Sequence, residues 1–191
     1  MYTLPIEALL ERVGMEPHHV EQIRKIESVM TPLAHEMALG FYDYLGKDPR
    51  SRALLWSEPG RVERLYGAFE VWYREMFAGV YDEEYAEKRW RVGIVHARYG
   101  VTTSAMIPAI GYIHTLALEH LLSALRPAEL PEVLEALTKV LALETTLMAE
   151  SYEVATAMGL GAGVDWKKAP QRGAEIILAE STSRLTFVRG R

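Results

Sequence analysis

The stretch Glu75–Gly100, EMFAGVYDEEYAEKRWRVGIVHARYG, is the most informative part of this chain. It places His96 near the end of an amphipathic helix, with Gly93 and Gly100 at i−3 and i+4 on the same helical face. A flat macrocycle can lie close to a helix where a ligating histidine is flanked by missing side chains. The pattern therefore favours haem as a cofactor and makes the protein a candidate gas binder.

Helical periodicity extends outward from this stretch over almost the whole chain, and no strand alternation appears before residue 174. The fold class is therefore predicted to be all-α. The expected helices cover about residues 4–13, 18–30, 32–45, 51–56, 61–77, 83–99, 103–125 and 131–158. Thr31 and Asp82 are expected N-caps, and Gly159 is expected to end the last long helix. The later segment AEIILAE fits either a short helix or an edge strand.

The composition changes at the glycine-rich segment GLGAGVDWKKAP, which begins at Gly159. We therefore expect one domain over residues 1–159, with 1–16 as an N-terminal extension helix. Residues 160–191 are expected to form a linker and a C-terminal arm. They offer no room for a second domain.

Composition narrows the possible functions. The chain has 191 residues, 49% of them hydrophobic, which suits one globular domain with a sizeable core. Its net charge of −5 argues against nucleic-acid binding, and the absence of cysteine excludes disulfides and thiolate-ligated haem. The N-terminal residues do not resemble a secretory signal, and the uncharged run 99–118 favours a buried helix over membrane insertion. We expect a cytoplasmic protein.

The six histidines differ in their surroundings. His18 and His19 are expected at the surface, and His35, His114 and His120 have no partner at metal-binding spacing. His96 lies on a mostly apolar face. One interpretation is a core histidine satisfied by a backbone carbonyl. The other is an axial haem ligand whose second ring nitrogen donates to a carbonyl in the preceding turn.

The stretch from Phe77-Ala78-Gly79 through Asp82, Glu84, Tyr85, Arg89, Ile94, His96, Arg98 and Gly100 resembles the centre of the globin-coupled sensors. The globin domains of haem-based aerotaxis transducers, the protoglobins and the sensor single-domain globins share this lineage. The resemblance covers about residues 17–158. It implies a globin fold with an extra N-terminal helix and a reduced or absent fourth helix.

The resemblance also implies the residues of a haem b site. His96 corresponds to the proximal iron ligand, and Phe41-Tyr42 to the family's Phe-Tyr pair, which makes Tyr42 the distal donor to a bound dioxygen. Without the resemblance, the favoured interpretation of Tyr42 is an ordinary interfacial tyrosine. The remaining expected haem neighbours are Leu65, Ala68 and Phe69 on the distal side, and Val92, Gly93, Tyr99 and Met106. Arg89 and Arg98 are candidate partners for the haem propionates.

One departure from the family concerns Met106, which stands where the aerotaxis transducers carry a signalling tyrosine. Tyr99 or Tyr112 could substitute for it. A second departure is that only the arm after Gly159 follows the last helix. A signal would therefore pass through a downstream partner protein, or the protein would work alone as a ligand carrier or redox domain.

The stretches 107–125 and 134–158 are apolar almost all round, which suggests a second packing partner beyond the core. A homodimer built as a four-helix interface fits this pattern, as the relatives associate, and a broader single core is the alternative. We expect a non-enzymatic sensor that reversibly binds O2, CO or NO at ferrous iron. The alternatives are a haem-free interaction module, an O2 carrier, or a haem enzyme that detoxifies NO or peroxide.

Overall fold

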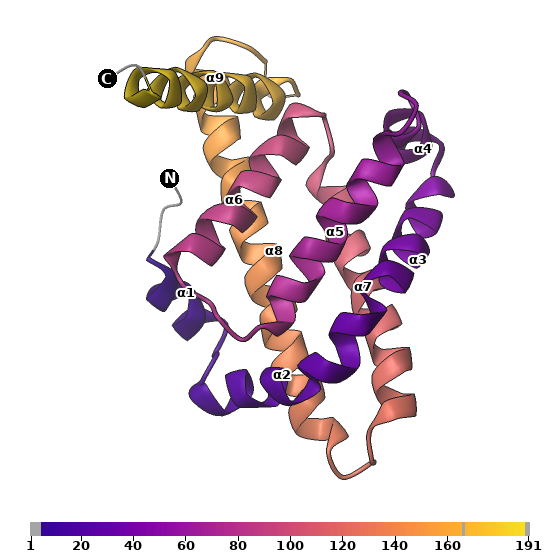
Figure 1. Cartoon of the computed structure of the whole chain (residues 1–191). Helices are drawn as coiled ribbons and strands as arrows, with labels where there is room; N and C mark the ends of the chain where they lie inside the picture. The colour runs from indigo at the N-terminus through magenta and orange to yellow at the C-terminus, as the bar shows by residue number, and fades with distance from the viewer. Residues whose placement is uncertain (1–4, 166, 190–191) are drawn as a thin grey trace. The chain divides into compact units, whose positions relative to one another are not determined.

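The structure is a computed structural model that describes residues 5–165 and 167–189, with side chains described as far as residue 181. Every regular element among these residues is helical, so the predicted all-α class is confirmed (Figure 1). The elements are α1 (Ile6–Arg12), α2 (Pro17–Met30), the 3-10 turn η1 (Thr31–Leu33), α3 (Ala34–Gly46), α4 (Pro49–Leu55), α5 (Arg61–Phe77), α6 (Glu83–Arg98), α7 (Thr103–Ala124), α8 (Leu130–Gly161) and α9 (Ala169–Arg189).

Most predicted helix boundaries agree with the structure to within a few residues. Helix α5 has the predicted bounds, and Asp82 caps α6 because its side chain accepts a hydrogen bond from the backbone N–H of Tyr85 at 2.9 Å. Thr31 is not the expected N-cap, since it lies within the 3-10 turn before α3. Helix α4 has 7 residues and is the short segment between α3 and α5.

The chain divides into two compact units. The first comprises the residues up to Leu9, Tyr81–Ile107, and the chain from Leu143 onward. The second comprises Leu10–Val80 and Pro108–Ala142. Each unit is described by itself below.

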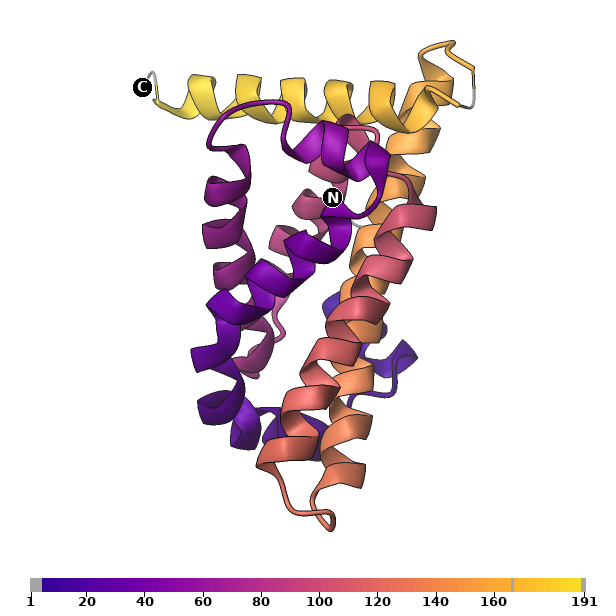
Figure 2. The ribbon, with the colours of Figure 1, turned by 90° about the vertical axis from the view of Figure 1, so that its right-hand side faces the viewer.

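The second unit contains α2, α3 and α5, and α5 packs on both of the other two helices. The part of α7 after Pro108 and the part of α8 before Ala142 run side by side in opposite directions (Figures 1 and 2). Gly40 of α3 approaches α7 closely, because a Cβ atom there would lie 3.4 Å from Leu116 Cδ1. This unit contains Phe41, Tyr42 and the expected distal residues of α5.

The first unit contains α6, the C-terminal part of α8, and α9, which packs on α6. Figure 2 shows α9 crossing the end of α8 steeply. The crossing brings the two backbones together: a Cβ atom at Gly159 would lie 1.8 Å from the Ala169 carbonyl oxygen, and one at Gly173 would lie 1.7 Å from the Ala155 carbonyl oxygen. The prediction that Gly159 ends the helix is therefore wrong, because this glycine serves close packing inside α8. The undecided segment AEIILAE is helical.

Helix α7 is long and apolar enough to span a membrane on length and composition, and it is the one such helix among the residues described. Only 28% of its most apolar 18-residue segment is buried. The two most exposed large hydrophobic side chains of α7 are Ile107, 53% exposed, and Leu122, 55% exposed. Helix α7 therefore has apolar surface that the chain itself leaves uncovered.

Candidate functional site

His96 lies in the last turn of α6, in the first unit. Its side chain is partly buried, and its Nδ1 atom is fully buried without a hydrogen-bond partner. Burial lowers the pKa of the imidazole from 6.5 to about 4, because the charged form loses its hydration. His96 is therefore neutral at physiological pH, which is the form that binds metals. The expected carbonyl acceptor in the preceding turn is not engaged.

Other buried side-chain atoms also lack partners within the described residues: the Tyr73 hydroxyl, Trp90 Nε1 and Glu150 Oε2. His96 differs from them because it is a neutral imidazole at the edge of an exposed surface. Val92, Val95 and Tyr99 are 37%, 37% and 52% exposed, and with His96 they fall at the spacing of one helical stripe. An imidazole beside exposed apolar side chains fits the requirements of a flat apolar macrocycle with a metal at its centre.

The two glycines near His96 have other roles than the ones predicted. A Cβ atom at Gly93 would lie 2.0 Å from Ser151 Oγ and 2.9 Å from the Met148 carbonyl oxygen. Gly93 therefore makes room for α8 and not for a macrocycle. Gly100 has φ +72° and follows the end of α6, where the Val101 N–H donates to the His96 carbonyl at 3.0 Å. This is the usual left-handed glycine that ends a helix.

A buried polar cluster at the start of α6 was not predicted from the sequence. Arg89 Nε donates to Glu144 Oε1 at 3.0 Å, and both side chains are almost completely buried. The Tyr85 hydroxyl donates to the same carboxylate, and the Arg89 guanidinium lies 4.1 Å from the centre of the Tyr85 ring. Burial, and then the Glu144 charge, raise the pKa of Tyr85 well above its usual range.

This cluster joins α6 to α8 and corrects the expectation that Arg89 contacts a propionate. Its guanidinium is held inside the first unit by Glu144. Arg98, the other candidate, is exposed. The sequence did contain a signal, because Glu144 interrupts an otherwise apolar stretch of α8 and therefore needs a buried cationic partner.

Tyr42 lies on α3, in the second unit, and is buried. Its hydroxyl donates to the Leu65 carbonyl oxygen of α5 at 3.5 Å, which is a long and weak hydrogen bond. Burial, and then the neighbouring Tyr66, raise the pKa of Tyr42 well above its usual range. The phenol therefore keeps its proton and can donate it to another acceptor at little cost.

Aromatic side chains surround Tyr42 within the second unit. Phe41 stacks on Phe69 with ring centres 5.0 Å apart, and the Tyr42 ring meets Phe69 edge-on at 6.3 Å. Leu65 is half-buried and Ala68 is exposed on α5. The structure thus brings together Phe41, Tyr42, Leu65 and Phe69, whereas Ala68 contributes only its position on the same helix.

The remaining candidates have ordinary surroundings. Met106 is buried near the start of α7 in the first unit, and Tyr112 stacks on Tyr44 of α3 with ring centres 4.0 Å apart in the second. The prediction that His19 lies at the surface is wrong, because it is buried and accepts a hydrogen bond at Nδ1 from the Glu16 N–H at 3.0 Å. No group of three potential metal ligands occurs among the described residues.

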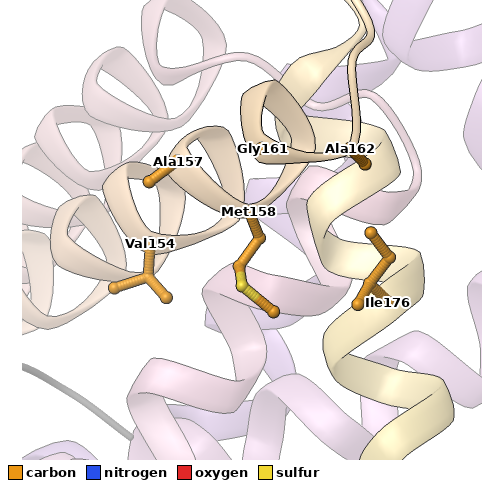
Figure 3. A pocket seen from close by; sticks show the side chains of 6 residues that line it. All are labelled: Val154, Ala157, Met158, Gly161, Ala162 and Ile176. Atoms are coloured by element: carbon orange, nitrogen blue, oxygen red, sulfur yellow. The ribbon is translucent and has the colours of Figure 1, made fainter.

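An apolar groove of about 550 Å³ lies in the first unit between the end of α8 and α9. Figure 3 shows Val154 and Met158 of α8 and Ile176 of α9 along it. The other lining residues are Ala157, Gly161 and Ala162, so the groove contains no titratable side chain. It offers apolar surface but no chemistry of its own.

The chain is similar to known proteins both by a family profile and by solved structures. The protoglobin family profile matches residues 5–157. The chain is similar to the globin domain of a globin-coupled sensor from Geobacter sulfurreducens, with 22% identity and a TM-score of 0.74 over 78% of this chain and 99% of that one. It is also similar to the ferric and ferrous forms of the globin domain of DosC from E. coli, with 19% identity and a TM-score of 0.64. That similarity covers 75% of this chain and 97% and 96% of the two DosC chains.

At these identities the solved structures establish the fold, which is that of a globin, and the described residues include two short helices of 7 residues, α1 and α4. The family profile extends over most of the chain, from α1 to the last turns of α8. The chain therefore belongs to the protoglobin family, the lineage of the globin-coupled sensors.

Proposed function

We propose that this globin holds haem b through His96 and reversibly binds a diatomic gas as a sensor. One observation supports this most strongly: a neutral imidazole, whose buried Nδ1 lacks a partner, stands beside the exposed apolar stripe of Val92, Val95 and Tyr99. Haem iron would supply the site for O2, CO or NO. The chain's part is to hold the iron through Nε2 of His96 and to cover the macrocycle with apolar side chains.

Tyr42 is proposed as the hydrogen-bond donor to a bound dioxygen. Its raised pKa keeps the phenol protonated, and its 3.5 Å bond to the Leu65 carbonyl is weak enough to be given up. A bound dioxygen carries partial negative charge, so a donor in an apolar setting stabilises it. The stacked Phe41 and Phe69 hold the Tyr42 side chain in place.

Binding without substrate turnover is the proposed activity, so we place the protein outside the enzymes. Peroxide chemistry would need a good proton acceptor beside the ligand. Tyr42 is a poor general base because its proton is so firmly held.

The output of the sensor is proposed to pass through a homodimer and a downstream partner protein in the cytoplasm. The uncovered apolar surface of α7, including Ile107 and Leu122, suits packing against a second copy of the chain. Sedimentation at micromolar concentration should give twice the monomer mass of 21.6 kDa. Leu122→Glu should return the protein to a monomer, whereas a parent protein that is already monomeric would contradict the dimer.

The proposed haem site is tested by titrating the full chain with haemin and recording the Soret band. The parent chain should take up one equivalent, and His96→Ala should lose the band. His114→Ala is the matched control, because it removes a partly buried histidine from α7 and should leave the band intact. A parent protein that stays colourless would indicate a haem-free interaction module instead.

A further inference from the structure

Two buried polar atoms of the first unit form the basis of this inference: the orphaned Nδ1 of His96 on α6 and the hydroxyl of Ser151 on α8. Ser151 belongs to α8, is fully buried, and donates from Oγ to the Met148 carbonyl oxygen at 2.6 Å. This bond uses its only proton. The oxygen lone pairs of the hydroxyl remain available as acceptors.

The contact at Gly93 brings Ser151 next to the turn of α6 that precedes His96. Its Oγ lies 2.0 Å from the position that a Cβ atom of Gly93 would occupy, so only glycine admits it. Side chains on a helix lean toward its N-terminus, which carries the His96 ring back over the turn that contains Gly93. The imidazole and the buried hydroxyl are therefore expected to face the same part of the α6–α8 contact, although Nδ1 has no hydrogen-bond partner among the residues that the structure describes.

From these positions we propose that Ser151 is a positioning residue for the iron ligand, accepting a hydrogen bond from Nδ1–H of His96. The inference rests on the proposed haem site. Backbone carbonyls of α6 near His96 already accept helical hydrogen bonds, whereas the Ser151 oxygen has a free acceptor position. With Nδ1–H bound to Ser151, the tautomer is fixed and Nε2 is left to the iron.

The interaction also predicts the strength of the iron–imidazole bond. A hydrogen bond from the non-ligating nitrogen raises the basicity of the imidazole, and loss of such a partner typically weakens metal binding roughly 10- to 100-fold. Gly93 then acts through Ser151, because its missing side chain lets the hydroxyl reach α6. This explains a glycine next to the ligand without any contact between that glycine and the cofactor.

The test compares Ser151→Ala with Thr156→Ala in the full chain. Thr156 is a matched control on the same helix, since its hydroxyl donates to the Tyr152 carbonyl at 2.7 Å in the same back-bonded manner. Ser151→Ala should lower the iron–histidine stretching frequency of the ferrous protein, raise its reduction potential, and speed haem loss roughly 10-fold or more. Thr156→Ala should leave all three at the parent values.

A second readout needs no haem. In the apoprotein, imidazole ¹⁵N shifts of His96 should indicate protonation at Nδ1, and Ser151→Ala should move the ring toward the other tautomer. Unchanged shifts and an unchanged iron–histidine frequency in Ser151→Ala, in a protein with a normal Soret band, would overturn this inference alone. A parent protein without any Soret band would overturn the haem site itself.

Discussion

The two halves of α6 treat buried polar side chains in opposite ways. In the first half, Arg89 and Tyr85 both reach the carboxylate of Glu144, so the polar groups satisfy one another. In the second half, Nδ1 of His96 is buried without a partner, beside exposed apolar side chains. Buried polar atoms are seldom left unpaired in proteins. The first half thus attaches the helix to α8. The second half contains the imidazole whose Nε2 we propose as the iron ligand and whose Nδ1 we propose to bond to Ser151.

Removal of the buried ion pair in the first half of α6 should lower the free energy of unfolding more than any other change. Glu144→Gln removes the carboxylate charge that pairs with the buried Arg89 guanidinium, and breaking a buried ion pair typically costs about 3–5 kcal/mol of folding free energy. Haem bound per folded molecule should stay unchanged, because Glu144 only positions the helix. Chemical denaturation and a haemin titration on the same sample measure both quantities.

The control for this variant is Glu87→Gln on the same helix. Glu87 pairs with Arg91 at 3.0 Å on the exposed face, where an ion pair contributes at most about 1 kcal/mol. Equal losses in the two variants would mean that the buried cluster has no special role.

A side chain added at the contact between the middle of α6 and α8 should have the next largest effect on the folding free energy. Gly93→Ala places a methyl group against Ser151 and the Met148 carbonyl, and overpacking of this kind costs about 1–3 kcal/mol. Gly67→Ala on α5 meets no atom within 4 Å and should instead stabilise by about 0.5–1 kcal/mol. Thermal melts that move in the same direction for both variants would refute the close contact.

Tyr42 offers a third kind of buried polar group, with a partner held only weakly. Tyr42→Phe removes the proposed donor and should speed dioxygen release by up to about tenfold, since one hydrogen bond contributes about 0.5–1.5 kcal/mol. Haem content should not change. Tyr44→Phe, on the same helix, should leave the release rate unaffected, and stopped-flow kinetics that show the reverse order would remove Tyr42 from the site.

Acid should destabilise the apoprotein through protonation of His96 in the second half of α6. The pKa of the ring is about 4 in the folded apoprotein and about 6.5 when unfolded, so the unfolded chain binds more protons between these values. The stability contributed by the neutral ring is therefore complete above pH about 6.5 and lost as the pH falls toward 4. Denaturation midpoints of the apoprotein should fall across this window, and His96→Gln should flatten the change.

The helices were predictable because their signals are local. The apolar positions of α5 repeat at helical spacing, and Asp82 followed by two acidic residues is a strong helix start, so both features appear in the structure as expected. The resemblance that centres on His96 also led to the correct family. These inferences needed no knowledge of which helix packs on which.

The errors arose where the partner is distant in sequence. Gly93, Gly159 and His19 each depend on a residue of another helix, namely Ser151, Ala169 and Glu135. Arg89 looked available for a propionate because Glu144 is 55 positions away in the chain. Helical periodicity shows that a face is buried but not which residue covers it.

The most direct test of the difference between the two halves of α6 is to replace the His96 side chain with free imidazole. His96→Gly should bind haemin weakly and lack the iron–imidazole signature in its absorption spectrum, and added imidazole should restore both. Glu144→Gln should need no imidazole. A His96→Gly protein with the parent spectrum in the absence of imidazole would show that another side chain holds the iron, and would contradict the assignment of His96.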